Sequence, residues 1–108
     1  MINAERTLDA LGDPTRRLVF KRLRAGSRSV TEIAKGLDVS RPAVSQHLKV
    51  LKTAGLAIVR VEGRRRLYAV DTRGIEVLRG WLDGFWSKAL VAFKDAAERQ
   101  AAKERRAR

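Results

Sequence analysis

The sequence contains no cysteine and only one histidine. The absence of cysteine excludes disulfides, thiolate metal sites, thiol redox switches and cysteine catalysis. A single imidazole also excludes, within one chain, the clusters of histidine ligands that hold zinc in many proteins. Redox chemistry based on thiols and metal binding based on cysteine or several histidines are therefore removed from the candidate functions.

Long apolar runs are also missing. No stretch approaches the ~18 consecutive apolar residues that a membrane-spanning helix needs. The N-terminal segment carries charges at Glu5, Arg6 and Asp9, so it lacks the apolar centre of a secretory signal peptide. We therefore expect a soluble, cytoplasmic protein.

Acidic residues are few relative to basic ones, with 12 Asp and Glu against 24 Lys and Arg, which gives a formal charge of +12. Such an excess favours a polyanionic partner, either nucleic acid or an anionic membrane surface. The length of 108 residues suits one domain with a small core, which oligomerisation can reinforce. We expect this domain to cover residues 1–99 and residues 100–108 to form a basic, frayed tail.

Capping residues and apolar spacing predict four short helices in the first half of the chain. Asp13 followed by Pro14 is typical of a helix start, and Ser29 with Glu32 has the spacing of a capping box. The predicted segments are residues 2–11, 14–26, 29–36 and 40–55. The apolar positions of the first segment are Ala4, Leu8 and Leu11. The side chains expected to be buried in the next two are Leu18, Val19, Phe20, Leu23, Ile33, Ala34 and Leu37.

After residue 56 the pattern changes to two short segments of strand-forming residues, 57–61 and 66–70, with a hairpin tip at 62–65. A last helix is predicted from about Arg73 to Ala97, capped by the two residues before it. The expected fold class is mainly α with a small β-hairpin. It is a winged helix-turn-helix of about five helices plus a two-stranded wing.

Residues 29–51 are a helix-turn-helix candidate because two short helices are joined by a short connection. In the second of these helices Val44, Leu48 and Leu51 share one face, and polar side chains lie opposite. No Asp or Glu occurs in residues 41–53. Most polar helix faces are simply solvated, but this combination favours a recognition helix in the major groove of DNA.

The side chains of this polar face suit DNA contacts of two kinds. Gln46 can pair with an adenine edge, and Ser45 can reach several bases. Arg41 lies at the helix start, where backbone amides and the helix dipole favour phosphate. With the arginines of the hairpin, the expected DNA-binding residues are Ser40, Arg41, Ala43, Ser45, Gln46, Lys49, Arg64 and Arg66.

The hairpin tip carries three consecutive arginines, with Arg60 on the preceding strand. In alternating strand geometry Arg64 and Arg66 share a face, while Arg65 points away. A basic hairpin can enter a minor groove or follow the phosphate backbone, and it can equally keep a strand edge from pairing with another chain. Beside a helix-turn-helix, we favour the DNA contact.

The last predicted helix is apolar over more than one face between Trp81 and Phe93. A terminal helix in a small monomer needs one buried stripe, so a second apolar face indicates a partner chain, unless Trp81 and Trp86 cover the domain's own core. We expect an isologous homodimer. The expected interface residues are Leu8, Leu78, Leu82, Phe85, Trp86, Ala89 and Phe93.

Four stretches carry a likeness to a known family: LGDPTRRL at 11–18, TEIA at 31–34, SRPAVSQHLKVLKTAGL at 40–56, and EGR at 62–64 followed by Tyr68. In these the sequence resembles the ArsR-type (ArsR/SmtB) family of winged helix-turn-helix repressors, over about residues 7–97. The resemblance implies a cytoplasmic homodimer whose first and last helices pair across the dimer. It also implies that the recognition helices and wings grip a roughly palindromic operator.

The sequence departs from that family in its metal ligands. Many members sense metals through cysteines in the third helix or through Asp, His and Glu on the last helix. Here there is no cysteine, residues 71–108 contain no histidine, and carboxylates alone are poor ligands for soft metals. We therefore predict no metal, no cofactor and no recognisable inducer site, and expect the lone His47 to pack or to form a hydrogen bond.

The function expected from these features is a sequence-specific DNA-binding transcriptional regulator, a homodimeric repressor. The alternative is a non-specific architectural or RNA-binding protein, although the few aromatics are not interleaved with basic residues as base-stacking surfaces require. A winged-helix protein-interaction module leaves the basic face unexplained. An enzyme is least favoured, since no phosphate-binding glycine loop and no nucleophile–base pair occurs. The sequence also shows no strongly amphipathic basic helix of the kind that binds an anionic lipid surface.

Overall fold

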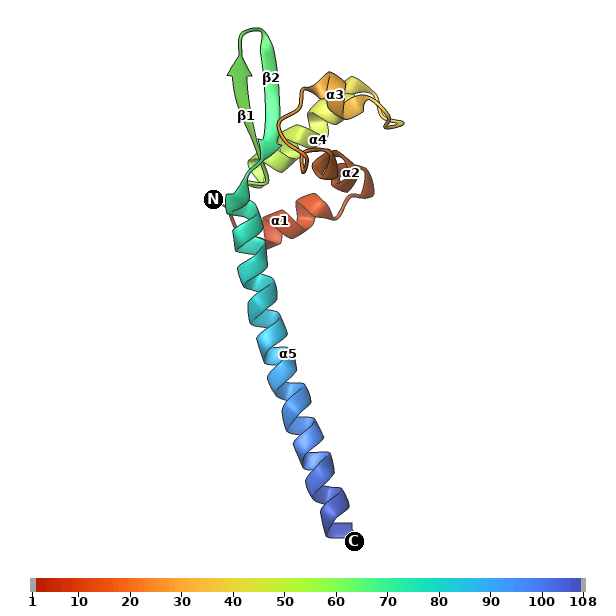
Figure 1. Cartoon of the computed structure of the whole chain (residues 1–108), viewed down its shortest axis with the longest axis vertical. Coiled ribbons are helices and arrows are strands. Elements are labelled where there is room, and N and C mark those ends of the chain that lie inside the picture. Colours follow the sequence, from red (N-terminus) through yellow and green to blue (C-terminus); the bar gives the residue numbers. More distant parts are fainter. Residues whose placement is uncertain (1, 108) are drawn as a thin grey trace. The chain divides into compact units, whose positions relative to one another are not determined.

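The structure of the chain is a computed structural model that describes residues 2–107. The contacts divide the chain into two units, the first ending at Leu78 and the second starting at Arg79. The elements in chain order are α1 (Ala4–Leu11), α2 (Pro14–Arg22), α3 (Val30–Ala34), α4 (Arg41–Thr53), β1 (Ala57–Glu62), β2 (Arg65–Val70) and α5 (Thr72–Ala107) (Figure 1). This confirms the predicted fold class, five helices with one antiparallel hairpin. The domain boundary at residue 99 stays a prediction.

The predicted caps start the helices where the sequence indicates. The side chain of Asp13 accepts a hydrogen bond from the backbone N–H of Arg16 at 2.9 Å. In the capping box, the Ser29 hydroxyl accepts from the N–H of Glu32 at 3.2 Å, and the Glu32 carboxylate accepts from the N–H of Ser29 at 3.1 Å. These bonds satisfy N–H groups that the helices themselves leave unpaired.

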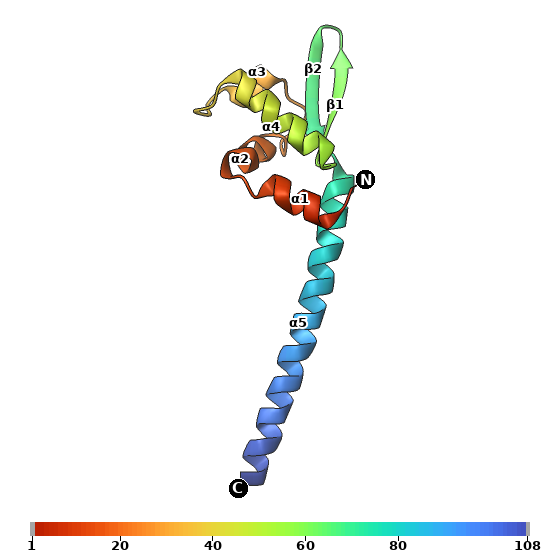
Figure 2. The same cartoon turned by 180° about the vertical axis from the view of Figure 1, so that it is seen from behind.

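Helix α4 lies at the centre of the first unit. It packs against α1, α2, α3 and β1, and Figure 2 shows it running from α3 to the base of the hairpin. Val44, Leu48 and Leu51 are fully buried, as predicted. The core also contains Ala10, Val19, Leu23, Ile33, Ala54, Leu56 and Ala57. The polar face of α4 is thereby held outward by its apolar face.

Leu18, expected on the buried side of its helix, is exposed instead, and Leu8 at an apolar position of α1 is exposed as well. Leu8 is 38% exposed and Leu18 is 47% exposed. Helix α1 turns Thr7 and Ala10 inward, and the Thr7 hydroxyl is satisfied by donating to the Ala4 carbonyl at 2.8 Å. The small side chains of Thr7 and Ala10 occupy the narrow space between α1 and the core, so Leu8 of the same helix is turned outward.

The hairpin is tighter than predicted. β1 and β2 are antiparallel, and Glu62 pairs with Arg65, so the tip is Gly63 and Arg64 rather than residues 62–65. Gly63 has φ of 64°, which a glycine adopts without strain. Arg64 lies in the turn and outside β2, so strand alternation does not apply to it, and a shared face with Arg66 stays a prediction.

The start of α5 is fixed to the end of α4 by close backbone contacts. The N–H of Gly74 donates to the carbonyl oxygen of Gly55 at 2.9 Å, and the N–H of Asp71 donates to the carbonyl of Leu56 at 2.9 Å. A Cβ at position 74 would overlap the Gly55 carbonyl oxygen. Only a glycine at position 74 permits this approach.

The buried carboxylate of Asp71 caps the beginning of α5. It accepts the backbone N–H of Arg73 at 3.0 Å and the Nη2 of the same residue at 2.7 Å. The side-chain hydrogen bonds from Arg73 are the main cause that lowers the pKa of Asp71, against the opposing effect of burial. The carboxylate therefore stays ionised and holds its arginine partner.

Helix α5 extends to Ala107, not to Ala97 as predicted. Residues 97–107 contain no large apolar side chain, but they are rich in Ala, Glu, Gln, Lys and Arg, which form helix readily. The Gln100 side chain also donates to Glu104 one turn later at 3.2 Å. Fraying of residues 100–108 in solution stays a prediction.

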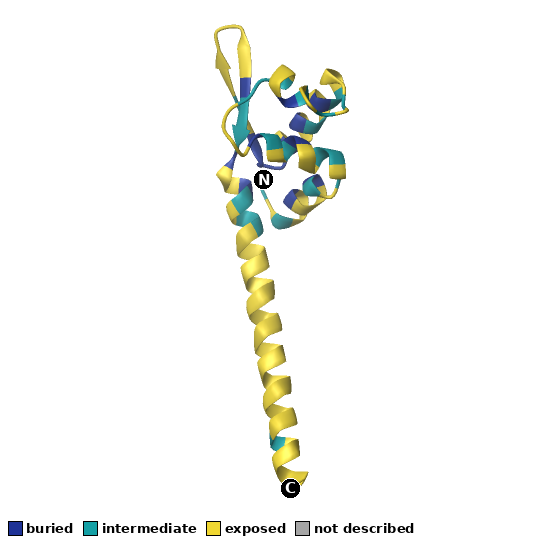
Figure 3. Cartoon of the chain, turned by 45° about the vertical axis from the view of Figure 1, so that its right-hand side comes forward, coloured by how far each residue is buried: buried dark blue, intermediate teal, exposed yellow. Residues whose placement is uncertain are grey.

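The second unit is a single helical segment with exposed side chains along almost its whole length (Figure 3). Trp81 and Phe85 stack with their ring centroids 5.9 Å apart. Within residues 2–107, no helix is long and apolar enough to cross a membrane.

Candidate nucleic-acid interface

Helix α4 presents the predicted recognition residues to solvent. Arg41, Ser45, Gln46 and Lys49 are exposed, and Ala43 is half-buried. This exposed face contains an amide, a hydroxyl and two cations, and no carboxylate lies within α4. Such a surface attracts a polyanion and offers the hydrogen-bonding groups that distinguish bases.

The beginning of α4 combines a cap with free donors. The Ser40 hydroxyl accepts from the N–H of Ala43 at 3.3 Å, and its own hydrogen remains available to donate. Arg41 is the first residue of α4, a helix of 13 residues, so it lies at the positive end of the helix dipole. This end of the helix suits a phosphate group.

His47 is half-buried beside Asp13, the residue that caps α2. The pKa of Asp13 is lowered mainly by the hydrogen bond from the Arg16 backbone, and the charge of His47 adds to this effect. The neighbourhood of His47 is thus a helix cap. Its role as a packing or hydrogen-bonding residue stays a prediction.

The wing, residues 57–70, is attached at two places. Backbone hydrogen bonds of 2.9 and 2.7 Å join Tyr68 of β2 to Arg28, just before α3, and the side chain of Arg65 reaches α3 itself. The Nη2 of Arg65 donates to the Glu32 carboxylate at 2.8 Å, and the same carboxylate oxygen accepts the N–H of Ser29 in the capping box of α3. The hydrogen bonds from Ser29, with the charge of Arg65, lower the pKa of Glu32. Arg65 therefore adds a side-chain contact near the tip of a wing whose base is fixed by the backbone, and Arg64 and Arg66 are exposed without such a contact.

Loss of the Arg65–Glu32 ion pair should loosen the tip of the wing, while the backbone hydrogen bonds between Arg28 and Tyr68 keep its base in place. In Glu32→Gln the amide still completes a capping box, but the ion pair with Arg65 is lost. We expect lower heteronuclear NOE values for residues 62–66 in the free protein, with Arg60→Gln as the matched control. That control removes the Arg60–Glu62 contact of 3.4 Å, which lies within β1. Identical NOE profiles for wild type and Glu32→Gln would show that the wing is rigid by itself.

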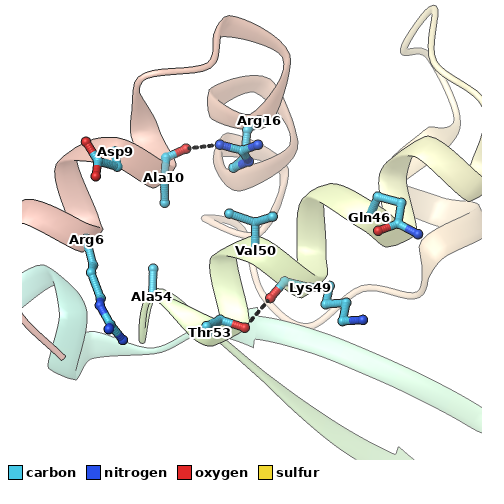
Figure 4. A pocket seen from close by; sticks show the side chains of 9 residues that line it. All are labelled: Arg6, Asp9, Ala10, Arg16, Gln46, Lys49, Val50, Thr53 and Ala54. Carbon is cyan, nitrogen blue, oxygen red and sulfur yellow. Dashed lines mark hydrogen bonds between the residues drawn. The ribbon is translucent and has the colours of Figure 1, made fainter. Parts of the chain in front are cut away.

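A groove of about 670 Å³ continues from the recognition face toward α1 and α2 (Figure 4). Gln46 and Lys49 form part of its wall. The full lining is Arg6, Asp9, Ala10, Arg16, Gln46, Lys49, Val50, Thr53 and Ala54. Arg16 is fixed at one end, because its Nη1 donates to the Ala10 carbonyl at 3.1 Å.

The groove adds two cations that the sequence analysis missed. Arg6 on α1 and Arg16 on α2 line the same depression as Lys49 on α4, with Asp9 as the one carboxylate in its lining. Nothing in the spacing of these residues indicates that they meet, because α1 and α2 approach α4 only through the tertiary fold. The basic surface is therefore broader than the recognition helix and the wing.

The expected dimer residues are distributed over both units. In the second unit Leu82 is 48% exposed, and Phe85, Trp86, Ala89 and Phe93 are also exposed. In the first unit Leu8 is exposed and Leu78 is half-buried. Large exposed apolar side chains at this density are unusual on a monomer.

The possible metal ligands do not come together in the part of the chain that the structure describes. Among residues 2–107, no group of three or more His, Asp or Glu side chains is placed to hold a metal ion. The carboxylates with identified partners serve as helix caps, in ion pairs with arginines or, for Glu104, as the acceptor of a hydrogen bond from Gln100.

Comparison with known proteins adds to this geometry. Residues 13–59 match the family model described as "Bacterial regulatory protein, arsR family". The chain is 52% identical over 89 residues to the HTH-type transcriptional regulator Rv2034 of Mycobacterium tuberculosis, covering 82% of this chain and 83% of that protein. It is 30% identical over 79 residues to the transcriptional repressor SdpR of Bacillus subtilis, covering 73% of this chain and 88% of the repressor.

A solved structure shows the same architecture. It is the homodimeric winged helix-turn-helix DNA-binding domain of Mb0332 from Mycobacterium bovis, described as a possible ArsR-family regulator. The likeness has a TM-score of 0.62 at 26% identity and covers 78% of each chain.

Proposed function

The chain belongs to the ArsR family of bacterial regulatory proteins, and from this we propose that it is a homodimeric repressor that binds a palindromic DNA operator sequence-specifically. The family is one of winged helix-turn-helix transcriptional regulators, a class of DNA-binding proteins that are not enzymes. A regulator of this kind acts where the DNA is, so we place it in the cytoplasm.

One observation carries the proposal: the outward face of α4 is basic, free of carboxylates and equipped with Gln46 and Ser45. A non-specific architectural protein needs the cations alone. An amide and a hydroxyl at the centre of the exposed face are the groups that distinguish one base pair from another. This favours specific recognition over binding to the phosphate backbone only.

The proposed contacts divide into two kinds. Ser45 and Gln46, with the partly exposed methyl of Ala43, contact base edges in the major groove. The remaining proposed contacts neutralise phosphates and set affinity: Ser40, Arg41, Lys49, Arg64 and Arg66. The salt dependence of binding should then be steep, with a slope of roughly −0.9 per phosphate neutralised.

A dimer supports this mode of binding in two ways. The exposed apolar residues of α5 need a partner, and the similar Mb0332 domain is homodimeric. Twofold symmetry would present two recognition helices to half-sites separated by about one helical turn, ~34 Å. A palindromic operator is the DNA that matches such a protein.

Replacement of Gln46 tests the specific part of the proposal. Gln46→Ala should relax the base preference at one position in each half-site, at a cost of about 1–3 kcal/mol for the preferred base. Binding of a panel of operators with single base changes, followed by fluorescence anisotropy, measures this effect. Gln100→Ala on α5 is the matched control and should leave every preference unchanged. Full preference in Gln46→Ala would remove Gln46 from the recognition surface.

A further inference from the structure

A second cavity lies away from the proposed DNA-binding residues. It is a slot of about 360 Å³ in the first unit, between the end of α1, α2, the end of β2 and the first turn of α5. Its lining residues are Leu11, Arg17, Phe20, Lys21, Arg24, Val70 and Ile75. None of them belongs to α4 or to the exposed arginines of the wing, so the DNA interface does not account for it.

The inner part of the slot is apolar. Leu11, Phe20, Val70 and Ile75 pack against the core, but each is only partly buried, so their outer surfaces form an apolar floor. Sites for small molecules have this composition: a cavity of some hundreds of cubic ångströms, mostly apolar, with a few polar groups that orient the ligand.

The rim of the slot is cationic. Arg17, Lys21 and Arg24 follow one another at intervals of a helical turn, so they lie along one side of α2 and its continuation. The guanidinium of Arg17 donates to the Leu11 carbonyl at 2.7 Å and is thereby held at the edge. Lys21 and Arg24 have no carboxylate partner within residues 2–107.

No carboxylate lines the slot, in contrast to the groove beside α4, where Asp9 is present. A partly buried apolar floor with unpaired cations at one edge is complementary to a molecule with an apolar body and an anionic head.

We propose that this slot binds a small amphipathic carboxylate, with the hydrocarbon body on Leu11, Phe20, Val70 and Ile75 and the carboxylate between Lys21 and Arg24. Burial of each additional methylene should raise the affinity about fourfold until the slot is filled. The two ion pairs are exposed to solvent, so together they should contribute about tenfold.

The test uses the full chain without DNA and decanoate as the probe, below its micelle-forming concentration. In a titration followed by ¹⁵N-resolved NMR, the amide signals of the lining residues should shift at lower decanoate concentrations than those of other residues. Hexanoate and octanoate should bind progressively more weakly than decanoate. The double variant Lys21→Gln/Arg24→Gln should weaken decanoate about tenfold and leave 1-decanol unchanged, whereas the control Arg6→Gln should change neither.

Three results would overturn the proposal. The first is a set of shifts confined to residues 81–93, which would show that decanoate adsorbs to the exposed apolar residues of α5. The second is equal affinity of wild type and double variant for decanoate. The third is an absence of binding together with amide shifts in the slot that depend on protein concentration, which would identify a second copy as the occupant. Because no DNA is present, none of these results bears on the proposed repressor function.

Discussion

Leu82→Glu is expected to convert the proposed dimer into monomers and to weaken operator binding by about 10²- to 10⁴-fold. Leu82 is 48% exposed among the apolar side chains of α5, so a partner helix would cover it. A carboxylate there would be buried without a cation, which is costly. A monomer also loses the gain in affinity that comes from binding two linked half-sites at once.

Mass by light scattering and operator affinity by fluorescence anisotropy measure the two effects together. Val91→Glu is the matched control, because Val91 is also exposed, at 58%, but helical spacing places it on the side of α5 opposite Leu82. We expect the control to keep both the mass and the affinity of the wild type. An unchanged mass in Leu82→Glu would show that the dimer interface lies elsewhere.

Gly74→Ala is expected to destabilise the first unit, although alanine favours helix more than glycine does. The new Cβ would overlap the carbonyl oxygen of Gly55 and would lie 3.0 Å from the Cδ2 of Leu56. Backbone on one side and core on the other leave little room to relax, so we expect a loss of about 1–3 kcal/mol in the free energy of unfolding.

The matched substitution in the same helix should have the opposite sign. Nothing lies within 4 Å of a Cβ built on Gly80, so Gly80→Ala removes a flexible residue without a clash. The free energy of unfolding should rise by about 0.5–1 kcal/mol. Urea unfolding followed by circular dichroism compares the two variants. Equal effects of the two alanines would contradict the assigned role of the Gly55–Gly74 contact.

The parts of the fold that depend on local sequence were predicted well. Caps such as Asp13 and Ser29 act on N–H groups three residues away, so their spacing alone determines them. The burial of Val44, Leu48 and Leu51 follows from helical periodicity. The exposed face of α4 follows in turn, and with it most of the candidate DNA-binding residues.

The parts that depend on distant contacts were not predictable in this way. Arg65 and Glu32 are 33 residues apart, and the strand pattern gave Arg65 no role. The inward rotation of Thr7 depends on how closely α1 packs on the core. The groove that brings Arg6 and Arg16 beside Lys49 needs three helices to be placed together. In each case periodicity identifies a face, and the tertiary fold determines what that face meets.

The central claim is that the protein recognises a DNA sequence, and one binding measurement tests it most directly. Purified full-length protein is titrated against DNA from upstream of its own gene, by fluorescence anisotropy at physiological salt, with an excess of random-sequence competitor. We predict binding that survives the competitor, with half-sites about one helical turn apart in the protected fragment. Random DNA that abolishes binding to this fragment and to every selected sequence would contradict the claim and leave a protein that binds only the phosphate backbone.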